Sequence, residues 1–268
     1  MVTGGAVRLS GSGLGCSTWP QCEPGQFTPV FHAETAAHTF IEFGNRTLTG
    51  VLGVIALALA WVVWRERSRP GWYRRLALMP LVGVVVQAVI GGITVLADLH
   101  PAVVGLHMVV SLGLIAASAA LLALDGEAVV GRPAVSARTL TVGRALLVAA
   151  AVLMVLGTVA TGAGPHGGDD EVAYRYAVDP VLVSKAHALA VWVFVALLVT
   201  CLWLLRREGV PSRTRRAWWV LLAVTASQGL VGYVQYFTGL PQVVVGMHLL
   251  GTGVLTATLT WAWFRLPR

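Results

Sequence analysis

The sequence predicts an all-α polytopic membrane protein, folded as a bundle of transmembrane helices. Of its 268 residues, 56% are hydrophobic and only 12% are charged, and the mean hydropathy is +0.75. This composition is too apolar for a soluble domain and is typical of a chain that crosses a bilayer several times. Apolar segments long enough to cross about 30 Å of hydrocarbon recur along the whole chain, so no soluble domain is expected.

Seven of these segments are predicted to span the membrane, each as a helix of about 20 residues. Three lie in a predicted N-terminal half, residues 1–125, which also carries an outer loop with a cysteine pair. Four lie in a predicted C-terminal half, residues 140–268. The expected spans are residues 44–64, 76–98, 102–124, 141–163, 181–205, 217–238 and 242–264.

An internal repeat relates the two halves. A glutamine precedes a histidine by 20 residues in both, at Gln87 and His107 (107 − 87) and at Gln228 and His248 (248 − 228), and 7 of the 21 aligned positions are identical. We therefore expect two pseudo-repeated four-helix halves, with the first helix of the first half missing. We hypothesise that the sequence begins at an internal methionine and that an eighth span precedes it in the natural protein.

Arginines supply most of the net charge of +7, and they gather in alternate loops. Excess Lys and Arg marks the cytoplasmic side of a membrane protein. The pattern predicts a multi-pass protein of the plasma membrane, with its N-terminus outside and its C-terminus in the cytoplasm. Topology accounts for the basic loops, so no nucleic-acid partner is expected. The basic clusters lie within residues 65–75, 132–144, 206–216 and 265–268.

Histidines inside apolar spans are costly and are candidates for function. A shift of 141 residues superimposes the two copies and brings Asn45, His107, His187 and His248 to one level, about 6–12 Å below the outer surface. Two imidazoles at one depth on neighbouring helices can hold a haem iron, which favours His187 and His248 as ligands. One histidine per helix is too few for a metal site built from protein alone. The alternative is a pair of buried histidines satisfied by hydrogen bonds.

A second polar cluster lies at the start of the first span. His38, Glu42 and Asn45 share one helical face at spacings of i, i+4 and i+7. A carboxylate in or beside the hydrocarbon is costly unless it is paired or used. Glu42 is therefore either a functional acid, the salt-bridge partner of Arg46 one turn later, or an interfacial carboxylate.

The Gly-, Pro- and Ser-rich residues 1–30 are expected outside the membrane, and they contain Cys16 and Cys22. An extracytoplasmic compartment permits disulfide bonds. A bridge between the two cysteines is therefore predicted, with two free thiols as the alternative.

Together these segments resemble the haem A synthase family of membrane oxygenases. The resemblance rests on residues 2–22 with their Cys-x5-Cys pair, on 41–46, on 161–169 and on the histidine helices. It implies eight transmembrane helices in two four-helix halves. It also implies a haem b cofactor between His187 and His248 in the C-terminal half, and a substrate, haem O, in the N-terminal half.

The resemblance further implies a reaction, in which a porphyrin methyl group of haem O is oxidised by successive hydroxylations to the formyl group of haem A for terminal oxidase assembly. His107 would bind the substrate and Glu42 would be catalytic, while the loop disulfide would influence activity or haem transfer. The implied partners are a haem O synthase, terminal oxidase assembly factors and an electron donor that the sequence does not identify.

The chain departs from the family pattern at Asn45, which stands where the Glu-x-x-His motif of the family has its histidine. Because an amide is a poor iron ligand, His107 is the one strong ligand expected for the substrate, and His38 on the same stripe is a possible substitute. The alternative function is a bis-histidine membrane cytochrome b that acts only in electron transfer, for which Glu42 has no role. A transporter is a third option, which the absence of broken helices disfavours.

Overall fold

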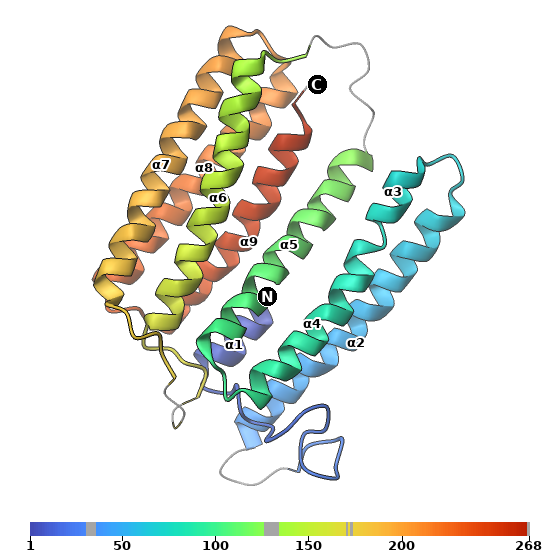
Figure 1. Ribbon diagram of the computed structural model, residues 1–268, viewed down its shortest axis with the longest axis vertical. Helices are drawn as coiled ribbons and strands as arrows, with labels where there is room; N and C mark the ends of the chain where they lie inside the picture. The colour runs from blue at the N-terminus through green and yellow to red at the C-terminus, as the bar shows by residue number, and fades with distance from the viewer. Residues whose placement is uncertain (31–35, 126–133, 170, 172–173, 267–268) are drawn as a thin grey trace. The chain divides into compact units, whose positions relative to one another are not determined.

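The computed structural model describes residues 1–30, 36–125, 134–169, 171 and 174–266. Within these ranges every regular element is a helix (Figure 1). Seven helical segments of the described residues are long and apolar enough to cross a membrane. The predicted all-α polytopic class is therefore confirmed, and the chain is a multi-pass membrane protein.

The helices coincide with the predicted spans, with α3 and α4 together forming the second of them. The break between α3 and α4 falls just before Pro80, which occupies the first turn of α4. Proline lacks the backbone N–H that a continuous helix requires, but it suits a helix start. The helices are α1 (Val2–Leu9), α2 (Ala36–Arg65), α3 (Gly71–Leu76), α4 (Met79–Leu96), α5 (Pro101–Asp125), α6 (Ala137–Ala163), α7 (Pro180–Arg207), α8 (Ser212–Phe237) and α9 (Gln242–Phe264).

Two boundaries differ from expectation. Residues 2–9 form the short helix α1, where only loop was predicted. Helix α2 begins at Ala36, eight residues before the predicted span (44 − 36). The added residues are polar at His38 and Glu42, and hydropathy alone excludes them from the span. They are helical because partners in the preceding loop satisfy both side chains.

The chain divides into two compact units. Unit 1 comprises residues Met1–Ala117 and Thr158–Pro180, and unit 2 comprises Ser118–Gly157 and Val181–Arg268. Helices α5 and α6 therefore each contribute to both units. The predicted halves, 1–125 and 140–268, describe the repeat in the sequence and stay a prediction.

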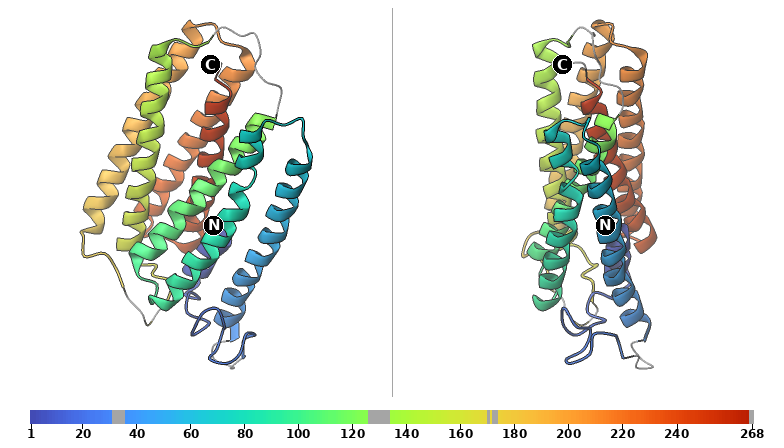
Figure 2. Two further views of the ribbon diagram at one scale, coloured as in Figure 1. Left: turned by 45° about the vertical axis from the view of Figure 1, so that its right-hand side comes forward. Right: turned by 90° about the vertical axis from the view of Figure 1, so that its right-hand side faces the viewer.

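In unit 2 the helices α7, α8 and α9 lie alongside the first part of α6 (Figures 1 and 2). Phe194 and Leu198 of α7 and Trp218 and Leu221 of α8 form a fully buried apolar core. This core occupies the later part of α7 and the early part of α8. The opposite end of the bundle, where α7 and α9 begin, is therefore left for polar groups.

In unit 1 the helices α2 and α4 pack together and α1 packs on α2. Gly83 of α4 lies against the Leu114 side chain of α5, where no larger residue would fit without movement. Apolar side chains cover the outer faces, as at Val54, which is 69% exposed. Such faces are expected to contact lipid.

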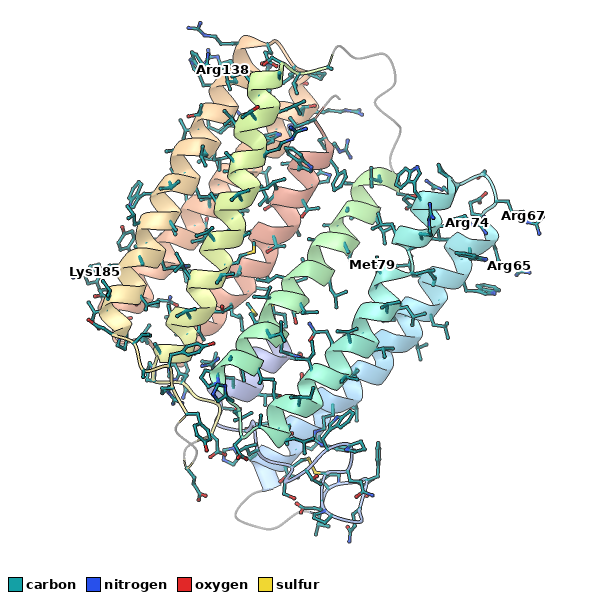
Figure 3. All side chains as sticks on the ribbon, in the orientation of Figure 1. Arg65, Arg67, Arg74, Met79, Arg138 and Lys185 are labelled. Carbon is teal, nitrogen blue, oxygen red and sulfur yellow. A yellow bond between two sulfur atoms is a disulfide. The ribbon has the colours of Figure 1, made fainter. Side chains whose placement is uncertain are left out.

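Basic and aromatic side chains mark one end of the spans in unit 1. Arg65, Arg67 and Arg74 gather where α2 ends and α3 begins (Figure 3). The guanidinium carbon of Arg74 lies 4.5 Å from the ring centre of Trp64. Residues of these two kinds collect at membrane–water interfaces, so this end of α2 is expected at one edge of the bilayer.

Candidate functional site

The two predicted haem ligands of unit 2 face each other. The ring centres of His187 and His248 are 6.5 Å apart, with 71° between the ring planes. His187 lies seven residues after the start of α7 (187 − 180) and His248 six residues after the start of α9 (248 − 242). Both are therefore about 10 Å along their helices, at the end of unit 2 that the apolar core leaves free.

The spacing of the two rings fits a single metal ion between them. A bond from a metal to an imidazole nitrogen is about 2 Å long, so two ligands on opposite sides of one ion place their ring centres roughly 6 Å apart. Among the described residues there is no group of three or more His, Cys, Asp or Glu that could hold a metal. A haem iron needs only the two axial imidazoles, because the porphyrin supplies its remaining ligands.

His187 is oriented through its ring. Its Nδ1 lies 3.1 Å from the carbonyl oxygen of Leu153 on α6, so an N–H there donates to that oxygen and leaves Nε2 with a free electron pair. The absence of a side chain at Gly157 makes room for the ring, because a Cβ there would lie 3.1 Å from Cε1 of His187. This is the arrangement usual for a metal-binding histidine, in which the second ring nitrogen fixes the tautomer.

His248 is held differently. Its Nδ1 is buried and has no hydrogen-bond partner among the described residues. Its backbone carbonyl instead accepts a hydrogen bond from Nε2 of Gln228 on α8, at 2.9 Å, and another from Oγ1 of Thr252, also at 2.9 Å. Nε2 of Gln228 also lies 3.2 Å from Oγ1 of Thr252. We call Gln228, His248 and Thr252 clamp 2.

The same contacts recur around His107 in unit 1. Nε2 of Gln87 on α4 lies 3.0 Å from the His107 carbonyl oxygen and 2.9 Å from Oγ of Ser111, which itself donates to that carbonyl at 3.0 Å. Nδ1 of His107 is also buried without a partner among the described residues. We call Gln87, His107 and Ser111 clamp 1. In the sequence the glutamines served only to align the repeat. The hydroxyl residues Ser111 and Thr252 did not stand out, although their positions correspond (252 − 111 = 141).

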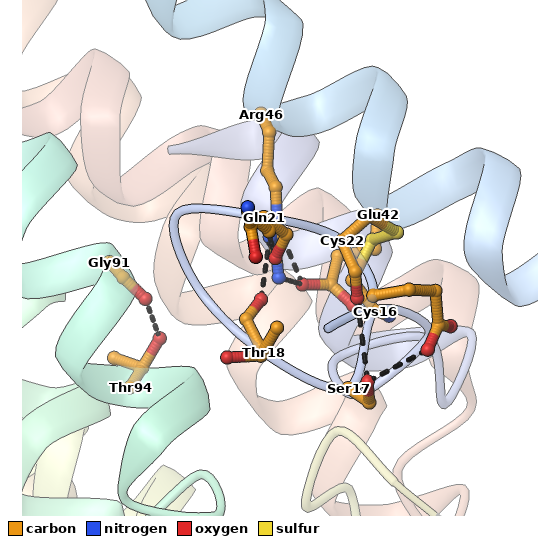
Figure 4. A network of polar contacts seen from close by, with 10 residues as sticks. Cys16, Ser17, Thr18, Gln21, Cys22, Glu42, Arg46, Gly91 and Thr94 are labelled. Carbon is orange, nitrogen blue, oxygen red and sulfur yellow. Dashed lines mark hydrogen bonds and ion pairs between the residues drawn. A yellow bond between two sulfur atoms is a disulfide. The ribbon is translucent and has the colours of Figure 1, made fainter. Parts of the chain in front are cut away.

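Glu42 is buried on α2 and both of its carboxylate oxygens are engaged (Figure 4). Oε1 accepts hydrogen bonds from Nη2 and Nε of Arg46, at 2.5 and 3.0 Å. Oε2 accepts one from the backbone N–H of Cys16, at 2.6 Å. The salt bridge to Arg46, one of the alternatives raised by the sequence, is therefore present, and the catalytic role of Glu42 stays a prediction.

Arg46 connects this pair to the loop closed by the Cys16–Cys22 disulfide. Its Nη1 donates to the carbonyl oxygens of Thr18 and Gln21, at 2.8 and 3.2 Å (Figure 4). The disulfide loop, residues 16–22, is thus held to α2 through one carboxylate and one guanidinium.

The other two predicted site residues of α2 are His38 and Asn45. Nδ1 of His38 is 3.0 Å from Oγ of Ser12, a partner that sequence analysis did not identify. The backbone of Gly15 lies directly against that of His38, which only a residue without a side chain permits. Asn45 is half-buried, one turn from Glu42 on the same face.

The segment 161–169 is held by Arg8 of α1. Nε of Arg8 donates to the carbonyl oxygen of His166 at 2.7 Å, and Nη2 donates to that of Thr161 at 2.9 Å. Burial, and to a lesser degree the nearby charge of Arg175, lowers the pKa of Arg8 to about 10. Arg8 therefore stays charged at neutral pH and ties together two segments that the sequence analysis singled out separately.

The fold is that of a polytopic helical membrane protein, and its paired histidines, His187 and His248, form a candidate haem site. The family model of the cytochrome oxidase assembly proteins, COX15-CtaA, matches residues 1–193, and the chain belongs to this family.

Individual relatives agree with this assignment. The chain is 33% identical over 113 residues to the heme A synthase of Bacillus licheniformis, a stretch that covers 42% of this chain and 36% of that protein. It is 31% identical over 113 residues to the heme A synthases of Bacillus mycoides and Bacillus cereus (strain AH187), covering 42% of this chain and 35% of each relative. The matched stretch thus spans about a third of the length of these relatives.

Proposed function

We propose that the chain is a haem A synthase, an oxidoreductase that converts a porphyrin methyl group of haem O into the formyl group of haem A. Membership of the family and the names of the relatives support this function. The observation that carries it is the pair of facing imidazoles, His187 and His248, whose 6.5 Å spacing suits one haem iron.

On this proposal His187 and His248 hold haem b in unit 2. When bound, this cofactor supplies one-electron transfer that amino-acid side chains cannot perform. The protein itself orients the His187 ring. The Leu153 carbonyl fixes the tautomer of His187, and Gly157 leaves space beside its ring.

The substrate haem O is assigned to unit 1. His107 is the proposed ligand of its iron, with Asn45 and His38 as further substrate contacts on α2. Since Nδ1 of His38 already lies against Ser12, only the other ring nitrogen of His38 is free to approach a substrate. Glu42 is the proposed catalytic carboxylate. Arg46 and the Cys16 N–H favour its charged form, which can accept a proton as the methyl group is oxidised.

The remaining parts of the proposal concern location and partners. We place the protein in the plasma membrane with its N-terminus outside, as the distribution of arginines predicts. A haem O synthase would supply the substrate, terminal oxidase assembly factors would receive the product, and a separate donor would deliver electrons.

The test is to express the chain in cells that make haem O but no haem A, and to separate the extracted haems by chromatography. We expect haem A to appear, and to disappear with the His248→Ala variant together with the low-spin haem b spectrum. A His100→Ala variant, which alters a histidine at the start of α5 outside the pair, should retain both. Low-spin haem b without any haem A would instead favour an electron-transfer cytochrome b.

A further inference from the structure

In clamps 1 and 2 the glutamine and the hydroxyl residue bind the backbone carbonyl of the histidine rather than its ring. In each, one glutamine amide from the neighbouring helix reaches the histidine carbonyl and the hydroxyl one turn later. Both N–H groups of the amide find acceptors, and the hydroxyl donates to the same carbonyl. Since no water competes within the hydrocarbon, these hydrogen bonds are expected to hold the two helices together at the level of the histidine.

Each clamp is paired with a glycine that supports the ring. Gly91 follows Gln87 by four residues, and Gly232 follows Gln228 by four, so each glycine lies on the same helical face one turn later. A Cβ on either glycine would lie 3.3 Å from Cε1 of the facing histidine. One helix therefore both grips the histidine's backbone and limits how far its ring can tilt.

The clamps replace the anchor that His187 has through its ring. Nδ1 of His187 bonds to the Leu153 carbonyl, whereas Nδ1 of His107 and of His248 has no partner among the described residues. A ring without such a bond can rotate more freely about its own side-chain torsions. The orientation of these two imidazoles must therefore come from the position of their backbone and from the facing glycine.

We propose that Gln228 and Thr252 are positioning residues, which set the plane and tilt of the His248 imidazole as an axial haem ligand, and that Gln87 and Ser111 do the same for His107. This inference rests on the proposed function, because it assumes that the histidines bind haem iron. It predicts that loss of one hydroxyl or amide alters the ligand geometry while the histidine itself stays in place.

The chain offers matched variants for clamp 2. Thr252→Val keeps the shape of the side chain and removes its hydroxyl, whereas Thr252→Ser retains the hydroxyl and copies clamp 1. Thr258→Val is the control. Oγ1 of Thr258 donates at 2.8 Å to the Val254 carbonyl in its own helix, as Thr252 does to His248, but among the described residues it makes no hydrogen bond to α8. Gln228→Leu removes the amide from the other side of the clamp.

The experiment compares these full-length proteins, purified with haem b bound, by electron paramagnetic resonance and by the rate of haem transfer to apomyoglobin. For Thr252→Val and Gln228→Leu we expect shifted low-spin g values and about tenfold faster haem loss, the size usual when a residue supporting a metal ligand is removed. Thr252→Ser and Thr258→Val should match the wild type in both measurements. If Gln228→Leu fails to fold, Thr252→Val decides the result alone.

Two results would overturn the inference, and they differ from each other. A lower melting temperature with wild-type g values and haem-loss rate in Thr252→Val would mean that the clamp only stabilises the fold, while the proposed function would stand. A wild-type protein that shows no low-spin haem at all, with its fold verified, would contradict the proposed function and the role of the clamp together.

Discussion

At the scale of single residues, Glu42 is a buried carboxylate that also attaches the disulfide loop to α2. A buried carboxylate is costly unless donors surround it, and here Arg46 and the N–H of Cys16 engage both oxygens. The same donors attach the disulfide loop to α2. A loss of activity on mutation is therefore informative only if loop attachment is measured as well.

Glu42→Gln preserves the shape of the side chain and removes its charge. We expect haem A formation to be abolished, while the low-spin spectrum of the haem b proposed for unit 2 is unchanged, since its proposed ligands His187 and His248 belong to that unit. Thermal unfolding should show a loss of about 1–3 kcal/mol, because the Arg46 hydrogen bonds weaken in a largely buried pair. Chromatography of extracted haems and optical spectra measure the first two effects.

Arg46→Ala is the matched comparison for this prediction. It removes the loop contacts of Thr18 and Gln21 but leaves the carboxylate. If Glu42→Gln makes haem A at the normal rate while its melting temperature falls to that of Arg46→Ala, Glu42 acts only as a structural anchor.

At the scale of elements, the disulfide loop docks on α4 as well as on α2. The ring of Trp19 lies directly on the backbone of Gly92, in a contact that leaves no space for a side chain. The preceding residue, Gly91, faces the ring of His107. Two adjacent glycines of α4 thus contact the loop on one side and the proposed substrate ligand on the other.

Gly92→Ala should displace Trp19 and loosen the loop. Inserting a methyl group into such a contact typically costs about 1–3 kcal/mol, and the loop should become more susceptible to proteolysis. Limited proteolysis followed by mass spectrometry locates the cleavage. Gly113→Ala on α5, where no atom lies within 4 Å of the added methyl group, is the control and should be neutral or slightly stabilising. Equal cleavage in both variants would contradict the docking role of Trp19.

The start of α6 depends on a carboxylate from the end of α7. Oε1 of Glu208 accepts hydrogen bonds from the hydroxyls of Ser136 and Thr139, both at 2.6 Å, and Oε2 accepts one from the Ser136 N–H at 3.2 Å. Partial burial opposes ionisation, but these hydrogen bonds outweigh it and lower the pKa of Glu208. The contact joins two helices of unit 2 at one end.

The direction of this pKa shift predicts a pH dependence. The pKa of Glu208 is lower in the folded protein than in the unfolded chain, where a glutamate has a pKa of about 4.3. The contribution of Glu208 to stability is therefore complete above the unfolded-state pKa, and it is lost as the pH falls through the folded-state pKa. Glu208→Gln should therefore melt below the wild type at pH 7, and the difference should shrink below about pH 4. Melting curves in detergent at both pH values measure it, and a difference that is independent of pH would contradict the role of the charge.

At the scale of the whole molecule, the distribution of arginines predicts one orientation in the membrane. The loops rich in arginine alternate with loops that contain few, and this predicts that residues 164–179 lie outside and residues 208–211 inside. Alkaline phosphatase fused after Gly168 should be active, because the enzyme folds only outside the cytoplasm, and fused after Gly209 it should be inactive. The opposite pattern would reverse the proposed topology.

Properties of short stretches of chain were predictable from the sequence. The seven spans follow from runs of about 20 apolar residues, and His107, His187 and His248 stand out because a polar ring is costly in hydrocarbon. Predictions were least accurate where polar side chains continue a helix beyond its apolar part, as at the start of α2. There the helix depends on partners in a loop rather than on local hydropathy.

Only the tertiary structure decided which groups meet. Three kinds of contact join residues that are 20 or more positions apart in the chain. They are the 6.5 Å spacing of His187 and His248, the hydrogen bond between the His187 ring and the Leu153 carbonyl, and the bonds from the two glutamine amides to the backbone carbonyls of His107 and His248. Hydropathy and helical periodicity describe which face of a helix is polar. They do not specify which neighbouring helix that face will contact, because that depends on how side chains of several helices pack together.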